Sequence, residues 1–393
     1  MDANLTMGLE EELFLVDKET GELCQHWPDA LWQLCQKKYP EQIEREFIRG
    51  QVELISKPAD TIDELQRDMQ GLRQFLIEQS NKVGLAPIAS GTHPSAIWQE
   101  QTPTISDRYA KLAHTLQVSA VRVLACGMHI HIGVADFDQR LKLYNSLIYY
   151  LPVFLALSAS SPFWSGKDTG LASYRASVLK GLPRSGLPPL FHSEDEYQAY
   201  LQRMLQAKAI DSGKELWWDL RLSARFPTVE LRVADVCTLQ SDALALSALL
   251  QSLSCYLIET QAESQQDLEM KHMLTEENRW RGQRYAVSEM ALISYVDQSL
   301  QPMSEIVAEL VERLVPYAQK LGCVKHLRNC LTIVNRGTSA ERQRQQYQQA
   351  ISKGMSEEAA LKKVVNDLAS QTAQLEKFES LKAKSEVLEM ATS

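Results

Sequence analysis

Four short segments of the chain each place two polar side chains at positions i and i+2, between apolar neighbours. These pairs are Glu10 with Glu12, Gln51 with Glu53, His129 with His131, and Glu230 with Arg232. Alternate residues of a β-strand point to the same face of a sheet. If the four segments are strands of one sheet, we expect one polar face rich in carboxylates and imidazoles.

Two interpretations of this alternation are open. Half-buried antiparallel strands often alternate simply because one face meets water, and for any single segment that explanation is the more common one. A solvated face usually mixes in Thr, Lys, Ser and Gln, whereas these positions are mostly Glu and His. Carboxylates crowded on one face repel one another unless cations neutralise them. The four segments together therefore favour a metal site.

The donor types indicate which metal and which substrate such a face would hold. Oxygen-rich clusters with an imidazole suit Mg²⁺ or Mn²⁺, and these positions hold no cysteine, the usual ligand of structural zinc. Divalent cations on carboxylates commonly hold a nucleoside triphosphate. The GxxxxGK phosphate loop fails at Gly166-Lys167, and neither GxGxxG nor GxSxG occurs. We therefore expect ATP, if bound, to be held by metal ions and the sheet.

Arginines would be needed to stabilise a transferred phosphoryl group and to bind a substrate carboxylate. Arg232 is the strongest candidate because it shares a face with Glu230 inside an apolar strand. For each of the others an ordinary surface charge is the more common explanation. These other candidates are Arg108, Arg175, Arg225, Arg279 and Arg281.

Bulk composition narrows the class of protein. The 393 residues are 45% hydrophobic and 23% charged, as in ordinary globular proteins. A formal net charge of −9 argues against nucleic acid as a partner, because phosphates require a basic surface. Seven cysteines without a CxxC pair fit free thiols in a reducing compartment, and the N-terminus has no signal-peptide pattern. We therefore expect a cytoplasmic protein.

Strand-like and helical segments follow one another without the regular βαβ rhythm of a parallel sheet, which predicts an α+β protein. The uncharged stretch 143–166 is long enough to span a bilayer, but Pro152 and Pro162 interrupt it. We interpret it as a buried helix that ends near residue 160, and expect no membrane contact. Further helices are expected at 61–83, which opens with a capping-box pattern, and at 108–120, 239–261 and 304–321.

An ordered set of motifs, spanning roughly residues 8 to 350, resembles a known family. The motifs are residues 8–17, 51–54, 91–94, 126–134, 155–164, 173–175, 217–219, 228–235 and 277–280. Each is weak alone, but together they look like the YbdK-type carboxylate–amine ligases, the type 2 glutamate–cysteine ligase family. The resemblance implies a fold like the catalytic domain of glutamine synthetase: a curved antiparallel sheet, flanked by helices, with the active site on its concave face.

The resemblance also implies the chemistry and the residues that perform it. ATP and Mg²⁺, or Mn²⁺, would serve as cofactors, and L-glutamate and L-cysteine would give γ-glutamylcysteine, ADP and phosphate through an acyl phosphate. The implied catalytic residues are Arg232, as a phosphate contact, with Arg175 and Arg108 at the substrate carboxylate or the phosphoryl group. The implied nucleotide-binding residues are Glu10, Glu53, Glu230 and Arg232. The implied metal ligands are Glu10, Glu12, Glu53, His129 and Glu230.

Several points stay open at this stage. The amine, the acid and the general base are not identified, and loop 181–189 is either a water-excluding lid or a plain connector. His93 and Trp164 could line the pocket, although a turn histidine and a core tryptophan are the favoured interpretations. We expect residues 1–375 to form one catalytic domain, 376–393 a helical or disordered tail, and the apolar helices to support a homo-oligomer, a dimer.

Two other functions compete with the ligase. A His-x-His strand also occurs in metal-dependent hydrolases, but those need further His and Asp ligands on successive strands. A nucleotide-binding regulatory protein with weak catalysis would keep the fold without the full activity. The remaining histidines, which are scattered without a hydrolase pattern, are at positions 26, 93, 114, 192, 272 and 326.

Overall fold

The computed structural model describes residues 5–104, 107–260, 265–288 and 291–375. At its centre lies a seven-stranded sheet with the order β10-β11-β5-β1-β3-β2, in which β4 also pairs with β1. All of its pairings are antiparallel. The strands of this sheet are β1 (Met7–Asp17), β2 (Ile43–Arg45), β3 (Gln51–Ile55), β4 (Leu85–Ile88), β5 (Met128–Gly133), β10 (Leu220–Leu222) and β11 (Thr228–Leu231).

Helices surround the sheet, and short two-stranded ribbons connect them, so the predicted α+β class is confirmed. The ribbons are β6 (Phe163–Trp164) with β7 (Lys167–Asp168), β8 (Ser185–Gly186) with β9 (Trp217–Trp218), and β12 (Ala291–Ile293) with β13 (Leu300–Pro302). The α-helices are α1 (Asp29–Lys38), α2 (Ile62–Lys82), α3 (Asp107–Leu116), α4 (Val118–Val121), α5 (Phe137–Leu147), α6 (Leu151–Ser158), α7 (Tyr174–Lys180), α8 (Glu194–Gln206), α9 (Gln240–Thr260), α10 (Gln265–Tyr285), α11 (Met303–Lys320), α12 (Val324–Arg336), α13 (Ser339–Ser352) and α14 (Glu357–Thr372).

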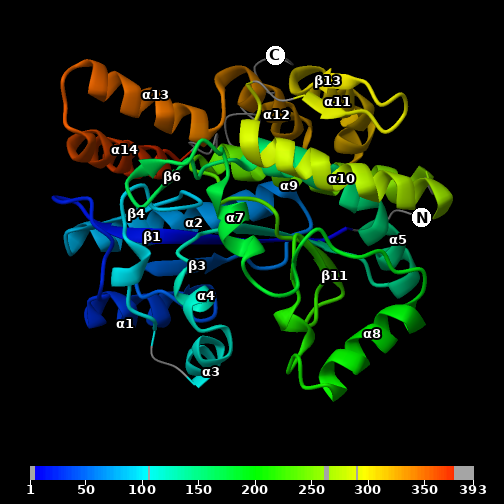
Figure 1. The fold of residues 1–393 in the computed structure, drawn as a ribbon, viewed down its shortest axis with the longest axis horizontal. Helices are drawn as coiled ribbons and strands as arrows, with labels where there is room; N and C mark the ends of the chain where they lie inside the picture. Colours follow the sequence, from blue (N-terminus) through cyan, green and yellow to red (C-terminus); the bar gives the residue numbers. More distant parts are fainter. Residues whose placement is uncertain (1–4, 105–106, 261–264, 289–290, 376–393) are drawn as a thin grey trace, which may run out of the picture.

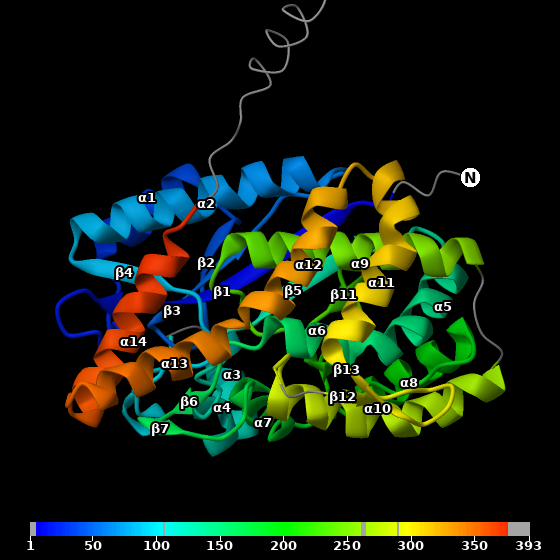
Figure 2. The same cartoon turned by 90° about the horizontal axis from the view of Figure 1, so that it is seen from above.

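The helices are distributed unevenly over the two faces of the sheet. Helices α2 and α9 pack directly on one face, and α11 and α12 form a second layer over α9. Figure 1 shows this stack above the blue strand β1, and Figure 2 shows it from above. Helices α3, α4 and α8 lie on the other side of the sheet in Figure 1. That side is therefore the one left for a cavity.

Most of the expected helices are present, with one correction. Helix α2 has the predicted capping box between Thr61 and Glu64, and α9 and α11 match the predicted segments to within two residues. The single helix expected at 108–120 is wrong. It is divided into α3 and α4 because Gln117 has a φ of 52°, which a continuous right-handed helix does not allow.

The apolar stretch interpreted as a buried helix forms the end of α5 and all of α6, which stops at Ser158. Pro152 lies in the first turn of α6, where its missing N–H is tolerated. Two helical stretches, 137–158 and 240–260, are long and apolar enough to cross a membrane by length and composition. However, 83% and 78% of their apolar windows are buried inside the fold, as expected of core helices.

The pleat of β1 sorts its three consecutive glutamates between the two faces of the sheet. Glu11 points towards the helices, where its carboxylate forms two hydrogen bonds of 2.7 and 2.8 Å with the guanidinium of Arg73 on α2. Both side chains are fully buried. Arg73 also donates to the carbonyls of Cys237 and Thr238. This pair therefore joins β1, α2 and the chain segment that follows β11.

His93 is buried away from the sheet's polar face, with every ring nitrogen engaged. Its Nδ1 accepts hydrogen bonds from the backbone N–H groups of Ser95 and Ala96 at 3.2 and 3.0 Å, so Nε2 carries the proton and lies 3.1 Å from the carbonyl oxygen of Gly21. Burial lowers the pKa of His93 to about 4. A proton on Nδ1 would break two of these bonds. The favoured interpretation as a turn histidine therefore fits its surroundings.

We predict that His93 makes the protein less stable in mild acid. Between pH 6.5 and pH 4 the unfolded state binds a proton at this side chain and the folded state does not, so the free energy of unfolding falls with pH. The expected loss between pH 7.5 and pH 5 is about 2 kcal/mol. Urea denaturation at both pH values measures it. In His93→Gln the change with pH should be smaller by this amount, and an equal change in both proteins would contradict the assignment.

Candidate active site

The four polar segments lie next to one another in the sheet, as β11, β5, β1 and β3. The register places Glu10 opposite His129, Glu12 opposite Glu53, and Glu230 opposite His131. All of these side chains line one cavity on the polar face. The predicted assembly of the four pairs on one face is therefore present in the structure.

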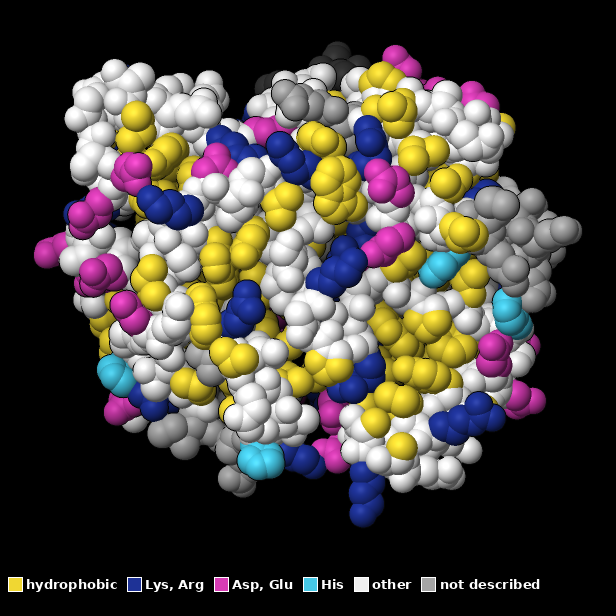
Figure 3. Space-filling view, in the orientation of Figure 1, with side chains coloured by type: hydrophobic (Ala, Val, Ile, Leu, Met, Phe, Trp, Pro, Cys, Tyr) yellow, Lys and Arg dark blue, Asp and Glu magenta, His cyan; other side chains and the backbone are white. Residues whose placement is uncertain are grey.

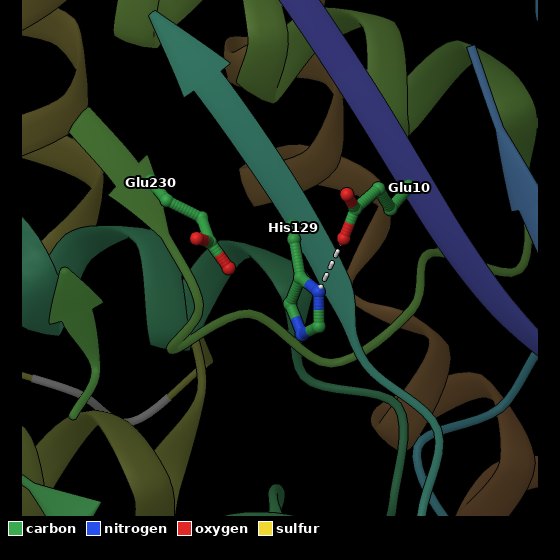
Figure 4. A group of neighbouring side chains, drawn as sticks. All are labelled: Glu10, His129 and Glu230. Carbon is green, nitrogen blue, oxygen red and sulfur yellow. Dashed lines mark hydrogen bonds and ion pairs between the residues drawn. The ribbon is translucent and has the colours of Figure 1, made fainter. Parts of the chain in front are cut away.

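Two groups of potential metal ligands share His129. Glu10, His129 and Glu230 form one group, and Glu12, Glu53 and His129 form the other; within each, the ligand atoms lie within 4.8 Å of one another. Figure 4 shows the first group converging from β1, β5 and β11. His129 Nδ1 lies 2.9 Å from Glu10 Oε2, and His129 Nε2 lies 4.0 Å from Glu12 Oε1. These groups contain all five residues predicted as metal ligands.

Glu230 lies between two arginines. Arg221, on β10, bonds to both carboxylate oxygens at 2.7 to 3.0 Å, and Arg232 donates to Oε1. Burial alone would raise the pKa of Glu230, but Arg232 and Arg221 outweigh it and hold that pKa at about 2. Glu230 is thus ionised at neutral pH. Sequence reasoning missed Arg221, although it alternates with Leu220 and Leu222 in the same way as the pairs that were found.

The other end of the cavity is acidic. Burial raises the pKa of Glu53 well above its ordinary value, and the neighbouring carboxylates of Glu46, Glu10, Glu12 and Glu44 raise it further. Glu44 is the direct cross-strand neighbour of Glu53, and both Glu44 and Glu46 line the cavity. Sequence reasoning also missed these two residues, which stand at i and i+2 around the short strand β2. A proton or a cation would relieve this repulsion.

Arg175 is held by the backbone rather than left free. Its guanidinium donates to the carbonyls of Arg232 and Val233 at 3.1 and 3.2 Å, and it lies in the cavity wall. A Cβ on Gly127 would come within 2.2 Å of its Nη2, so the glycine is needed for this close approach. Arg175 was predicted to contact substrate. In the structure its guanidinium also has a structural role, because it holds the backbone of Arg232 and Val233.

The backbone N–H of Arg232 is held by Asp219, which itself forms a buried ion pair with Arg279. Arg232 N donates to the carbonyl of Asp219 at 2.8 Å, and the Asp219 carboxylate pairs with Arg279 of α10. Arg279, a candidate from the sequence, is thus connected to the site through Asp219. The remaining candidate on α10, Arg281, bonds to the carbonyl of Ala291 and lies 3.9 Å from Glu277.

Of the other residues that the sequence suggested for the site, some lie away from the cavity, and the side chain of one is not among those that the structure describes. Arg108 is the second residue of α3, but its side chain lies outside the part of the chain that the structure describes. Among the described histidines, His129 and His131 line the cavity. His93 and Trp164 do not, and Trp164 packs against Tyr174 with ring centroids 5.2 Å apart. His93 thus fits the interpretation as a turn histidine, whereas Trp164 is half-buried at the edge of the core rather than inside it.

The cavity has a volume of about 690 Å³. In Figure 3 a hollow bordered by acidic and basic side chains lies in the lower middle of the face, between α4 and α8 as labelled in Figure 1. Its apolar wall comes from Leu116, Ala120, Val123, Leu179 and Leu182. The arrangement combines carboxylates, two imidazoles and four arginines beside an apolar wall, which suits a phosphorylated substrate held with metal ions.

The family model of glutamate-cysteine ligase family 2 matches residues 6–367. The chain belongs to this family. Two relatives carry the provisional name glutamate–cysteine ligase 2. The one from Jannaschia sp. (strain CCS1) is 41% identical over 93% of this chain and 96% of its own. The one from Rhodospirillum rubrum is 39% identical over 93% of this chain and 95% of its own. The family resemblance of the motifs is confirmed, and membership makes the chain an enzyme of the ligase class.

Solved structures support the fold. A bifunctional glutathione synthetase from Pasteurella multocida matches with a TM-score of 0.69 at 15% identity, over 94% of this chain and 52% of that one. A glutamate–cysteine ligase from Francisella tularensis, in complex with AMP, matches with a TM-score of 0.66 at 16% identity, over 98% of this chain and 92% of that one. At these identities the likeness establishes the fold of the family member alone.

We predict that Arg279 contributes more to stability than Arg281 on the same helix. Arg279→Met leaves the Asp219 carboxylate buried without its partner, which should lower the free energy of unfolding by about 3–5 kcal/mol. Arg281→Met removes one hydrogen bond and a weak, partly exposed pair, and should cost about 1 kcal/mol. Chemical denaturation of the two variants measures the difference. Equal losses would show that the buried pair with Asp219 has no special weight.

Proposed function

We propose that the chain is an ATP- and Mg²⁺-dependent ligase that joins the γ-carboxylate of L-glutamate to L-cysteine, giving γ-glutamylcysteine, ADP and phosphate. The observation that carries the proposal is the meeting of two carboxylate–histidine groups with Arg232 in one cavity. Family membership supports the reaction class. The AMP bound to the F. tularensis ligase supports a nucleotide substrate here.

The donor set fits Mg²⁺ or Mn²⁺. The converging atoms are carboxylate oxygens and one imidazole nitrogen, which are the ligands these ions prefer. Glu44 and Glu46 add further negative charge beside Glu53, so a divalent cation would offset repulsion that the fold itself leaves in place. Bound there, the metal would neutralise phosphate charge and polarise the γ-phosphoryl group. Glu10, Glu12, Glu53, His129 and Glu230 would hold it.

The arginines divide into contact and positioning roles. Arg232 directly follows β11, which carries Glu230, and pairs with that carboxylate, so its remaining donors can face the γ-phosphoryl group and offset charge there. Arg175 bonds to the carbonyl of Arg232, so we assign it the role of fixing that backbone. Arg108 is proposed, from the resemblance alone, to contact the substrate carboxylate or the phosphoryl group.

The reaction would proceed in two steps. A carboxylate oxygen of the acid attacks the γ-phosphorus, and ADP leaves. The amine nitrogen then attacks the acyl carbon and gives up a proton, and phosphate leaves with the electrons of the broken C–O bond. Water must be excluded between the steps. Leu182 of loop 181–189 lines the cavity, while Ser185 and Gly186 pair with Trp217 and Trp218, which favours a fixed wall over a moving lid.

The identity of the amine and of the acid is the least constrained part of the proposal. Selection of a small side chain depends on pocket shape, and nothing in the sequence singles out cysteine as the amine. Ligation of a different acid or amine by the same chemistry is the alternative, followed by a nucleotide-binding protein with weak catalysis. A cytoplasmic homodimer remains our expectation for its location and assembly.

The test is ADP release from the purified protein with ATP and Mg²⁺. Glutamate alone, glutamate with cysteine, and a panel of other acids and amines are compared. We expect release that requires an acid and an amine together, and that falls at least about 100-fold in Glu53→Gln and Glu230→Gln. Loss of a metal ligand should exceed the roughly 10–100-fold cost of losing an outer-shell partner.

Glu22→Gln, an exposed change outside the cavity, is the matched control and should retain full activity. Release that persists without Mg²⁺ or in both glutamate variants would refute the proposed site. ATP binding without release under any pair would support the non-catalytic alternative.

A further inference from the structure

An exposed aromatic ring stands at one end of the cavity. Phe226 lies in the short turn between β10 and β11, lines the cavity, and is 48% exposed. Among the described residues it is the one large apolar side chain that both lines the cavity and is exposed. A single exposed apolar side chain is common on a protein surface, but this one borders the cavity and is therefore accessible to a ligand bound there.

The turn is a built structure rather than an arbitrary connection. Ser223 N donates to the carbonyl of Thr228 at 3.0 Å, and Thr228 N donates to the carbonyl of Phe226 at 2.8 Å. Ser223 Oγ accepts from Phe226 N at 3.3 Å. Val134 N, at the end of β5, donates to the carbonyl of Pro227 at 2.9 Å. The backbone that carries Phe226 is therefore tied both across its own hairpin and to the neighbouring strand.

A positively charged side chain lies over the ring of Phe226. The guanidinium carbon of Arg225 lies 4.9 Å from the ring centroid of Phe226. Arginine stacks on aromatic rings and on nucleobases alike. A planar ring of a ligand, such as a nucleobase, could therefore stack with Phe226 and Arg225 without breaking an ion pair.

Phe226 lies close along the chain to one of the carboxylate–histidine groups. It precedes Glu230 by four residues, at most about 13 Å along an extended chain at roughly 3.3 Å per residue. That is the scale on which the terminal phosphate and the base of a nucleoside triphosphate are separated. Glu230 belongs to the first carboxylate–histidine group and pairs with Arg232, the proposed contact of the γ-phosphoryl group. The charged end of the cavity would then take the phosphates and the hairpin would take the base.

We propose that Phe226, with Arg225, forms the stacking platform for the adenine ring of ATP. This inference rests on the proposed function and adds to it the site of the base. Stacking recognises a π-face rather than a hydrogen-bonding edge. The platform should therefore distinguish a nucleotide from a bare polyphosphate.

Other aromatic residues of the cavity are less suited to this role. Phe47 and Trp218 are buried in the core, and Trp217, which also lies near an arginine, is less exposed than Phe226. A homo-oligomer contact could also cover Phe226, and the following experiment separates the two occupants.

The experiment measures the dissociation constants of MgATP and of magnesium tripolyphosphate by calorimetry, without acid or amine. In Phe226→Ala we expect the constant for MgATP to rise about 5- to 100-fold, as for loss of one base–aromatic stack. The constant for tripolyphosphate should change less than about twofold, because tripolyphosphate has no base. Phe226→Tyr keeps the aromatic face and should bind MgATP like the original protein.

Leu205→Ala, on α8, removes an exposed apolar side chain outside the cavity and serves as the control. Unchanged MgATP binding in Phe226→Ala, or equal weakening of both ligands, would overturn the platform while leaving the ligase proposal intact. Failure of the original protein to bind MgATP would overturn both. A change in oligomeric state with unchanged MgATP binding would assign the ring to a subunit contact instead.

Discussion

The crowding of carboxylates on one face of an antiparallel sheet is the constraint on which the rest of this structure depends. The register brings Glu10, Glu12 and Glu53 onto neighbouring strands, with Glu230 two strands from Glu10. Like charges at such spacing cannot all ionise in a buried setting without compensation. The fold supplies that compensation unevenly. Arg221 and Arg232 stabilise the charge of Glu230, whereas the neighbours that affect Glu53 are further carboxylates.

The two ends of the cavity therefore differ in charge. At the β10–β11 end the protein's own cations balance its anions, so an anion entering the cavity there would meet arginine as well as carboxylate. At the β2–β3 end excess negative charge favours a divalent cation or the ammonium group of a substrate. One sheet can therefore receive an anionic and a cationic partner at opposite ends. The strands themselves need not move for this.

Buried polar groups outside the cavity brace those inside it. Asp235 accepts hydrogen bonds from Ser160 N, Ser161 Oγ and Ser173 Oγ, and Ser173 also caps the helix that carries Arg175. Arg175 in turn bonds to the backbone beside Asp235. Three separate segments are thus joined at one carboxylate. Networks of this kind are stable only when each member is satisfied, which makes the site rigid.

Much of the fold and part of the site could be predicted from local signals. The capping box of α2 and the alternation of β1, β3, β5 and β11 were visible because both patterns extend over consecutive residues. The same alternation surrounds Arg221, but its strand is only three residues long and offers too little pattern to recognise. Glu44 lies in an equally short strand, Glu46 follows that strand, and the residue between them is the charged Arg45. The break at Gln117 was missed because nothing in its residue type requires a positive φ.

The sequence by itself determined which side chains share a face within a strand, because the two-residue period of a strand is a local property of the backbone. It also determined the family, through the order of its motifs. Only the tertiary structure decided which strands are neighbours, and therefore that His129 belongs to two ligand groups at once. It also decided that Arg175 bonds to a carbonyl and Arg279 to Asp219, because such pairings depend on long-range packing.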